Sequence, residues 1–195
     1  MKNILIAVIV LATFVGCKKG ENDPGISFRS RDARVVGEWK VSSMEDETTT
    51  KIGTPVTSNK SETNKFDGSK KIKTVVVDGT TSPQQADDNK YEVKLEIKKD
   101  GTLAYSETRT APDGVVSSFS TTGTWNWADS RKNKTTISLN YFGGQTLSSG
   151  FYDIDQLKNK EMIFKAETET SSKTGGLASA GDTETKMTMS VTLTQ

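Results

Sequence analysis

The residues that could do chemistry in this chain are few in kind. The sequence of 195 residues contains no His and one Cys, Cys17. Mechanisms that need an imidazole base, a His-ligated metal, a disulfide within the chain or a thiolate-cluster zinc site are therefore excluded. Catalysis would have to use two carboxylates, as in glycoside hydrolysis, where two acids about 5 to 10 Å apart flank the scissile bond.

Carboxylates are spread along the chain rather than grouped. The acids available for such a pair are Glu107, Asp129, Glu167 and Glu169. Their spacing places no two of them across a cleft, and the sequence has no G-x-S-x-G elbow, Gly-rich phosphate loop or metal motif. The Asp87-Asp88 and Asp153-Ile154-Asp155 stretches lack the alternating oxygen ligands of a calcium loop. We therefore expect no enzyme, no metal site and no cofactor.

The charge balance excludes a second class of protein. Lys and Arg number 26 against 25 Asp and Glu, which gives a formal net charge of +1, and the chain has no dense basic run. A nucleic-acid binder needs a basic face to displace counterions from phosphates. We expect no nucleic-acid partner.

An apolar segment precedes the single cysteine. Lys2 is followed by a nearly unbroken apolar run over residues 4–15, which is too short for a permanent membrane span of about 20 residues. Residues 1–16 therefore read as a signal peptide. The run ends Phe14-Val15-Gly16-Cys17, which resembles the lipobox of bacterial lipoproteins. The resemblance implies that Cys17 receives diacylglycerol and that the leader is cut away before it.

A lipid on Cys17 would fix where the protein works. Each buried CH₂ of an acyl chain contributes about 0.8 kcal/mol, so two or three chains give stable membrane attachment. We expect a cell-envelope location, most simply at the outer membrane, because Lys18 rather than Asp follows Cys17. The alternative is an ordinary secretory signal with Cys17 near its cleavage point. Residues 17–33 hold Gly, Pro and mixed charges and predict a flexible tether.

From residue 34 onward the sequence alternates in the manner of half-buried strands. Residues 91–98 place four apolar side chains on one face and four charges on the other, and Asp100-Gly101 then supplies a hairpin turn into residues 102–109. The other predicted strands cover residues 35–43, 72–77, 115–127, 135–141, 150–157, 161–168 and 185–194. Residues 44–68 and 78–89 are polar and ambiguous, and residues 171–182 predict a hairpin loop. The pattern predicts an all-β fold of about eight to ten antiparallel strands, closed as a barrel or a sandwich.

Four short motifs occur in order along this domain. They are Gly37-x-Trp39 on the first strand, Lys98-x-Asp100-Gly101 at a turn, Thr-Gly-x-Trp-x-Trp over residues 122–127, and a Tyr-x-Ile-x-x-Leu stretch over residues 152–162. Together they resemble the lipocalin-like lipoproteins of diderm bacteria. The resemblance covers residues 34–195 and implies a meandering antiparallel barrel of the calycin kind, with Gly37 and Trp39 closing one end.

Large apolar side chains gather on the predicted inner face. The candidate ligand-binding residues are Tyr105, Phe119, Trp125, Trp127, Tyr141, Met187 and Met189. An eight-stranded barrel is either filled by such side chains or holds one small molecule. Two functions follow: a barrel that binds a small apolar or amphiphilic ligand, or a solid-packed module that contacts another envelope protein through long polar loops around residues 44–68 and 171–182.

Overall fold

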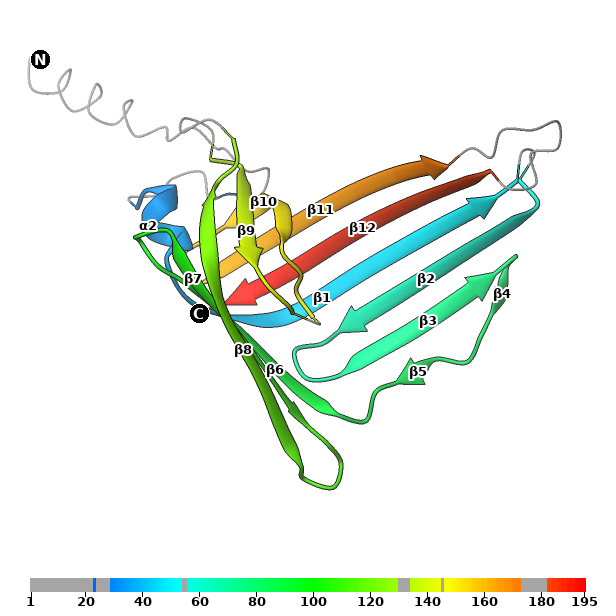
Figure 1. Cartoon of the computed structure of the whole chain (residues 1–195), viewed down its shortest axis with the longest axis horizontal. Helices are drawn as coiled ribbons and strands as arrows, with labels where there is room; N and C mark the ends of the chain where they lie inside the picture. Colours follow the sequence, from blue (N-terminus) through cyan, green and yellow to red (C-terminus); the bar gives the residue numbers. More distant parts are fainter. Residues whose placement is uncertain (1–22, 24–28, 54–55, 130–133, 145, 173–181) are drawn as a thin grey trace, which may run out of the picture.

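The computed structural model describes residues 23, 29–53, 56–129, 134–144, 146–172 and 182–195. About two thirds of these residues belong to strands, and few belong to a helix (Figure 1). The elements are α2 (Arg31–Val35), β1 (Gly37–Ile52), β2 (Ser58–Phe66), β3 (Lys71–Val77), β4 (Thr80–Thr81), β5 (Gln85–Ala86), β6 (Lys90–Ile97), β7 (Thr102–Thr110), β8 (Val116–Trp127), β9 (Thr136–Tyr141), β10 (Gly150–Leu157), β11 (Glu161–Ser172) and β12 (Thr183–Thr194).

Eight of these strands close into a barrel. Strands β6 to β12 pair in sequence order as an antiparallel meander, and β1 pairs with β12 on one side and with β6 on the other. The contact with β6 uses only Gly37 to Lys40 at the start of β1. The predicted all-β meander barrel is confirmed, including the tight hairpin at Asp100-Gly101, where Gly101 has a φ of 86°.

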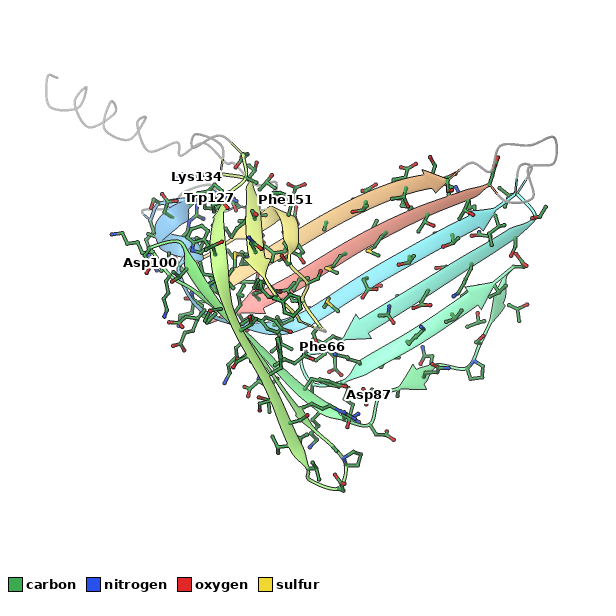
Figure 2. The ribbon with its side chains drawn as sticks, viewed as in Figure 1. Phe66, Asp87, Asp100, Trp127, Lys134 and Phe151 are labelled. Atoms are coloured by element: carbon green, nitrogen blue, oxygen red, sulfur yellow. The ribbon has the colours of Figure 1, made fainter. Side chains whose placement is uncertain are left out.

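Beyond the barrel the longest strands continue as an extended sheet. We define the wing as residues 45–52 of β1, 166–172 of β11 and 183–190 of β12, together with β2 and β3. On its second side β1 leaves β6 and pairs with β2 from Met44 to Ile52, and β2 pairs with β3. The wing is a single layer that projects from one end of the barrel (Figure 1), and its side chains stand on both faces of the sheet (Figure 2).

The prediction of a polar loop over residues 44–68 is wrong. This stretch forms the second half of β1, a turn and β2. Strand alternation is visible in a sequence only where one face is buried, and between Glu45 and Lys65 no described strand residue is buried. Thr48, Thr49 and Thr50 suit a pleat that water reaches from both sides, because a branched Cβ is stiff and packs on its strand neighbours.

The hydrophobic core lies inside the barrel. Among its fully buried side chains are Trp39, Leu95, Tyr105, Ile137 and Phe164. The aromatic rings pack against one another: Tyr152 stacks on Phe164 with ring centroids 5.4 Å apart. Phe66 of β2 is buried where the wing joins the barrel, as Figure 2 shows. The core therefore ends at the base of the wing.

Candidate functional site

The closed end of the barrel is built around Trp39. The helix α2 begins after Ser30, whose Oγ accepts a hydrogen bond from Ala33 N. Its first three residues overlap the end of the segment 17–33 that the sequence predicted as a tether. The indole Nε1 of Trp39 donates to the carbonyl oxygen of Val35 at 2.8 Å, which joins the end of α2 to the first barrel strand. Trp39 is 1% exposed. This end is sealed by side chains.

The backbone conformation at the same end favours a glycine. Gly37 has a φ of 150°, which residues with a side chain rarely adopt, and its nearest neighbour is the Gln195 side chain, whose Nε2 would lie 2.3 Å from an added Cβ. Asp23 is also anchored here: its Oδ1 accepts a hydrogen bond from Leu157 N at 2.8 Å, and its Oδ2 pairs with Arg31. Asp23 is thus fixed at the closed end of the barrel.

Three of the seven predicted ligand residues are core. Tyr105 and Tyr141 stack with ring centroids 5.0 Å apart and an angle of 16° between the ring planes. Trp125 is buried, and its Nε1 donates to the carbonyl oxygen of Lys98 at 2.7 Å. All three rings therefore belong to the hydrophobic core.

The other four lie in three separate places. Phe119 is 42% exposed and lies in the half of β8, before Gly123, that does not pair with β9. Its ring centroid is 6.3 Å from that of Tyr105. Trp127 lies near α2 (Figure 2), where its Nε1 donates to Oδ1 of Asp32 at 2.7 Å. Met187, 43% exposed, and Met189 lie on the wing. The structure therefore does not bring the seven residues together into one pocket.

The mouth of the barrel lies opposite the closed end. Residues of the connection between β9 and β10 cover it. Leu147 is fully buried, and its carbonyl oxygen accepts a hydrogen bond from the Tyr141 hydroxyl. Thr146 donates to Glu107 through its Oγ1 (2.9 Å, to Oε1) and its backbone N (3.2 Å, to Oε2). Side chains thus cover both ends of the barrel, and the inward side chains between them form the hydrophobic core.

Glu107 is the one buried acid on a barrel strand, among the residues described. It is 6% exposed on the inward face of β7 and also receives hydrogen bonds from the Tyr105 hydroxyl and from Lys71 Nζ, the latter at 3.2 Å. Burial alone would raise the pKa of Glu107, but the hydrogen bonds from Tyr105 and Thr146 and the charge of Lys71 outweigh it and hold the pKa below its ordinary value. The carboxylate therefore stays ionised and ties three elements together.

A second acid, Asp87, extends this polar network at the mouth. The Nζ of Lys71 lies 4.0 Å from the centre of the Tyr91 ring. The hydroxyl of Tyr91 donates a hydrogen bond to Asp87. Burial of Tyr91 and this hydrogen bond raise the pKa of Tyr91 to about 12. The network is therefore structural, because each of its groups is already satisfied by another. From the sequence, Glu107 is only one of four carboxylates available for a catalytic pair, although its place in the alternation after Leu103 and Tyr105 indicates an inward side chain.

A groove opens where the mouth meets the wing. We call it the mouth groove; its volume is about 660 Å³. Its apolar lining comes from Met44, Phe66, Met187 and Met189, and its polar lining includes Asp46, Asn64, Lys71 and Lys73. The two lysines are engaged, Lys71 by Glu107 and Lys73 by Glu62 at 2.7 Å. The groove therefore has an apolar surface of flexible Met side chains, and its two lysines are neutralised by carboxylates.

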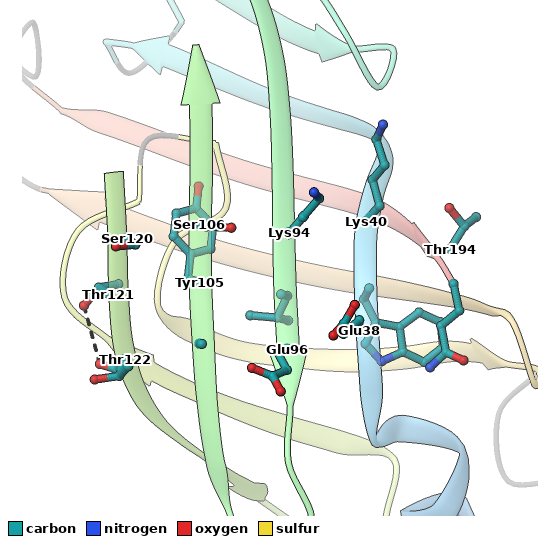
Figure 3. Close-up of a pocket in the computed structure, with 14 residues that line it drawn as sticks. Glu38, Lys40, Lys94, Glu96, Tyr105, Ser106, Ser120, Thr121, Thr122 and Thr194 are labelled. Atoms are coloured by element: carbon teal, nitrogen blue, oxygen red, sulfur yellow. Dashed lines mark hydrogen bonds between the residues drawn. The ribbon is translucent and has the colours of Figure 1, made fainter. Parts of the chain in front are cut away.

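A larger groove of about 840 Å³ lies on the outer face of β1, β6, β7 and β8 (Figure 3). Its floor carries the small side chains Ala104, Ser106, Ser120 and Thr122. Lys40 stands directly opposite Lys94 across the β1–β6 ladder, and Glu92 neutralises both, at 3.5 Å and 3.3 Å. Because these charges are half exposed and already paired, this groove is a solvated sheet surface rather than a built ligand site.

Comparisons with known proteins add no family. No protein-family model, no curated protein and no solved structure matches the chain. Over the residues that the structure describes, no helix has the length and apolarity to span a membrane. In the same residues, no three Asp, Glu or Cys side chains converge as a metal site would need.

Proposed function

We propose that this protein is a lipid-anchored lipoprotein of a bacterial cell envelope, attached through Cys17, most simply at the outer membrane. Its barrel acts as a rigid scaffold, and its wing is the surface offered to another envelope macromolecule. The proposal takes the anchor from the lipobox-like Phe14-Val15-Gly16-Cys17 and the mode of action from the contrast between the packed barrel and the solvated wing.

The packed interior is the observation that favours a scaffold over a container. A ligand-carrying barrel needs a lumen, whereas here Tyr105 and Tyr141 stack on each other in the core and Leu147 is buried at the mouth. Opening such a barrel would break the Thr146–Glu107 bonds and expose Leu147. The described strands of the wing, in turn, bury almost nothing, so the wing adds little to folding and much to accessible surface.

Crosslinking in the native host tests the scaffold function. A photoreactive amino acid at Thr168 or Met187 on the wing should give a discrete protein adduct, whereas the same group at Phe151, an exposed position on barrel strand β10, should not. Equal adducts from Phe151 and from the wing, or none from either wing position, would contradict the proposal.

The lipid anchor has its own test. Metabolic labelling with a radioactive or clickable fatty acid should mark the wild-type protein and not Cys17→Ser. Unchanged labelling of that variant would reject Cys17 as the attachment point.

One observation supports a second candidate function, the binding of a small amphiphile. The mouth groove places Met44, Phe66, Met187 and Met189 around one space, and an exposed Met187 is available to cover a ligand. Mass spectrometry of organic extracts from protein purified from its host should then find a co-purifying compound that is lost in Met189→Lys. A repeated absence of any compound would remove this candidate and leave the scaffold.

A further inference from the structure

The wing has one long unpaired border. Strand β10 pairs with β11 only between Met162 and Lys165, so within the described chain the outer side of residues 166–172 of β11 has no neighbouring strand. In Figure 1, β11 forms the upper border of the wing. Every residue from Glu167 to Ser172 is exposed. This border is a row of main-chain groups without a sheet partner.

Alternation along β11 fixes which main-chain groups face outward. The carbonyl of Lys160 accepts from Gln195 N on the β12 side, and that of Glu161 accepts from Lys158 N on the β10 side. The N–H and C=O of one strand residue point the same way, and the register with β12 runs from Glu161 to Ser172 without a bulge. Glu167, Glu169 and Ser171 therefore direct their N–H and C=O groups away from β12, into the open border.

The other border of the wing is treated differently. Strand β3 is covered along its outer side by β4, at Val76 and Val77, and by β5, at Ile72 and Lys73. Short covering strands, bulges and prolines are the usual means of blunting an edge. Residues 166–172 carry no proline and no bulge. The β11 border is thus left available where the β3 border is protected.

The charges beside this border select the occupant. On the outer face the four carboxylates of Asp153, Asp155, Glu167 and Glu169 outnumber two lysines. Lys165 pairs with Asp155 at 3.2 Å, and Lys186 of β12 pairs with Glu167 at 2.6 Å. A groove of about 740 Å³ on this face is lined by three of these carboxylates and also by Glu45 and Glu47. A second copy of the chain fits poorly, because antiparallel pairing about Glu169 would set that carboxylate opposite its own copy.

We propose that residues 166–172 of β11 accept an extended segment with Lys or Arg at alternate positions as an additional strand of the wing. The segment's main chain bonds to Glu167, Glu169 and Ser171, and its cations face Glu167 and Glu169 across the new ladder. This inference rests on the proposed function, since it names the kind of partner that the wing takes and the strand that takes it.

A synthetic peptide as long as the border, alternating Lys and Thr, is the direct probe, with a Glu-for-Lys peptide as its control. Added to the full chain, the Lys peptide should shift the NMR amide signals of Glu167, Glu169 and Ser171 and slow their exchange with solvent. Glu169→Pro removes one outward N–H and leaves the ladder to β12 intact, so it should weaken binding about tenfold while the wild-type melting temperature is kept. Replacing both Glu167 and Glu169 by Gln should weaken binding by a similar factor and flatten its salt dependence.

The open half of β8 supplies a matched control. Its residues 116–122 are also unpaired on one side within the described chain. The even-numbered residues direct their N–H and C=O groups to that open side, because Ala128 N donates to Thr136 O there. The side chains of Ser118, Ser120 and Thr122 are uncharged, so Ser120→Pro should leave the affinity for the Lys peptide unchanged.

Three results of the binding and self-association measurements would overturn the inference. They are equal binding of the Lys and Glu peptides, unweakened binding by Glu169→Pro, and self-association of the wild type that Glu169→Pro abolishes, which would make a second copy the occupant. The scaffold function is tested separately. Wing adducts at Met187 that persist in Glu169→Pro would contradict only the assignment of the partner to the β11 border. Absence of all wing adducts would contradict the scaffold function itself.

Discussion

Strands β1, β11 and β12 each run through two environments. In the barrel half of β1, Trp39, Val41 and Met44 are buried, whereas between Glu45 and Ile52 no residue is. The same ladder to β12 continues across the change, from Lys40–Thr194 to Ile52–Thr183. Strand pairing is therefore not limited by the reach of the core: cross-strand contacts extend the sheet after burial has ended.

The interactions that stabilise the wing are weaker than the packing in the barrel core. Ion pairs bridge neighbouring wing strands, among them Lys51–Glu184 at 3.1 Å, Lys65–Glu45 at 3.1 Å and Lys186–Glu167 at 2.6 Å. Exposed pairs of this kind each contribute about 0 to 1 kcal/mol and are screened by salt. The wing thus depends on the barrel that templates its first residues.

The largest expected difference is in local opening. In hydrogen exchange, the free energy of opening of barrel amides such as those of Val93 and Leu139 should be close to the free energy of global unfolding. For wing amides such as those of Thr48 and Thr168, the free energy of opening should be several kcal/mol lower. Exchange monitored by NMR or mass spectrometry measures both in one sample. Equal protection in the two regions would mean that they unfold as a single unit.

A large effect is also expected from removing the plug of the closed end. Trp39→Ala deletes a fully buried indole and its bond to Val35 O, so it should lower the free energy of unfolding by about 3 to 5 kcal/mol. Denaturant titration followed by circular dichroism measures it. A loss below about 1 kcal/mol would show that α2 and Trp39 do not seal the barrel.

Glu107 gives an intermediate effect that depends on pH. Glu107→Gln keeps the shape but loses the charge opposite Lys71, and should cost about 1 to 3 kcal/mol at neutral pH. Because the pKa of Glu107 is lowered on folding, its stabilisation is present above the ordinary pKa of 4.5 and is lost as pH falls through the folded value. The gap between wild type and variant should therefore narrow as pH falls below 4.5; a constant gap would contradict the lowered pKa.

The smallest effect belongs to the wing. Met187→Ala removes a side chain that is 43% exposed, so the free energy of unfolding should change by no more than about 0.5 kcal/mol. Thermal unfolding of this variant beside Trp39→Ala gives the comparison directly. A cost similar to that of Trp39→Ala would indicate that Met187 belongs to the core after all.

The contrast between the two regions also explains what the sequence could predict. Alternation located β6, β7 and β10, because each has one buried face, and it failed over residues 44–68, where both faces meet water. It likewise identified the rings of Tyr105 and Tyr141 as inward. It could not show that Trp127 meets Asp32, or that Glu107 meets both Lys71 and Thr146, because those contacts join residues far apart in the chain.

The anchoring of Asp23 at the closed end has a consequence for how the molecule stands on its membrane. If Cys17 carries the lipid as proposed, six peptide units link it to a residue fixed beside Leu157, and fully extended they span about 20 Å. An attachment this short would hold α2 and Trp39 toward the bilayer surface. The wing, at the other end of the barrel, would then be the part of the molecule farthest from the membrane.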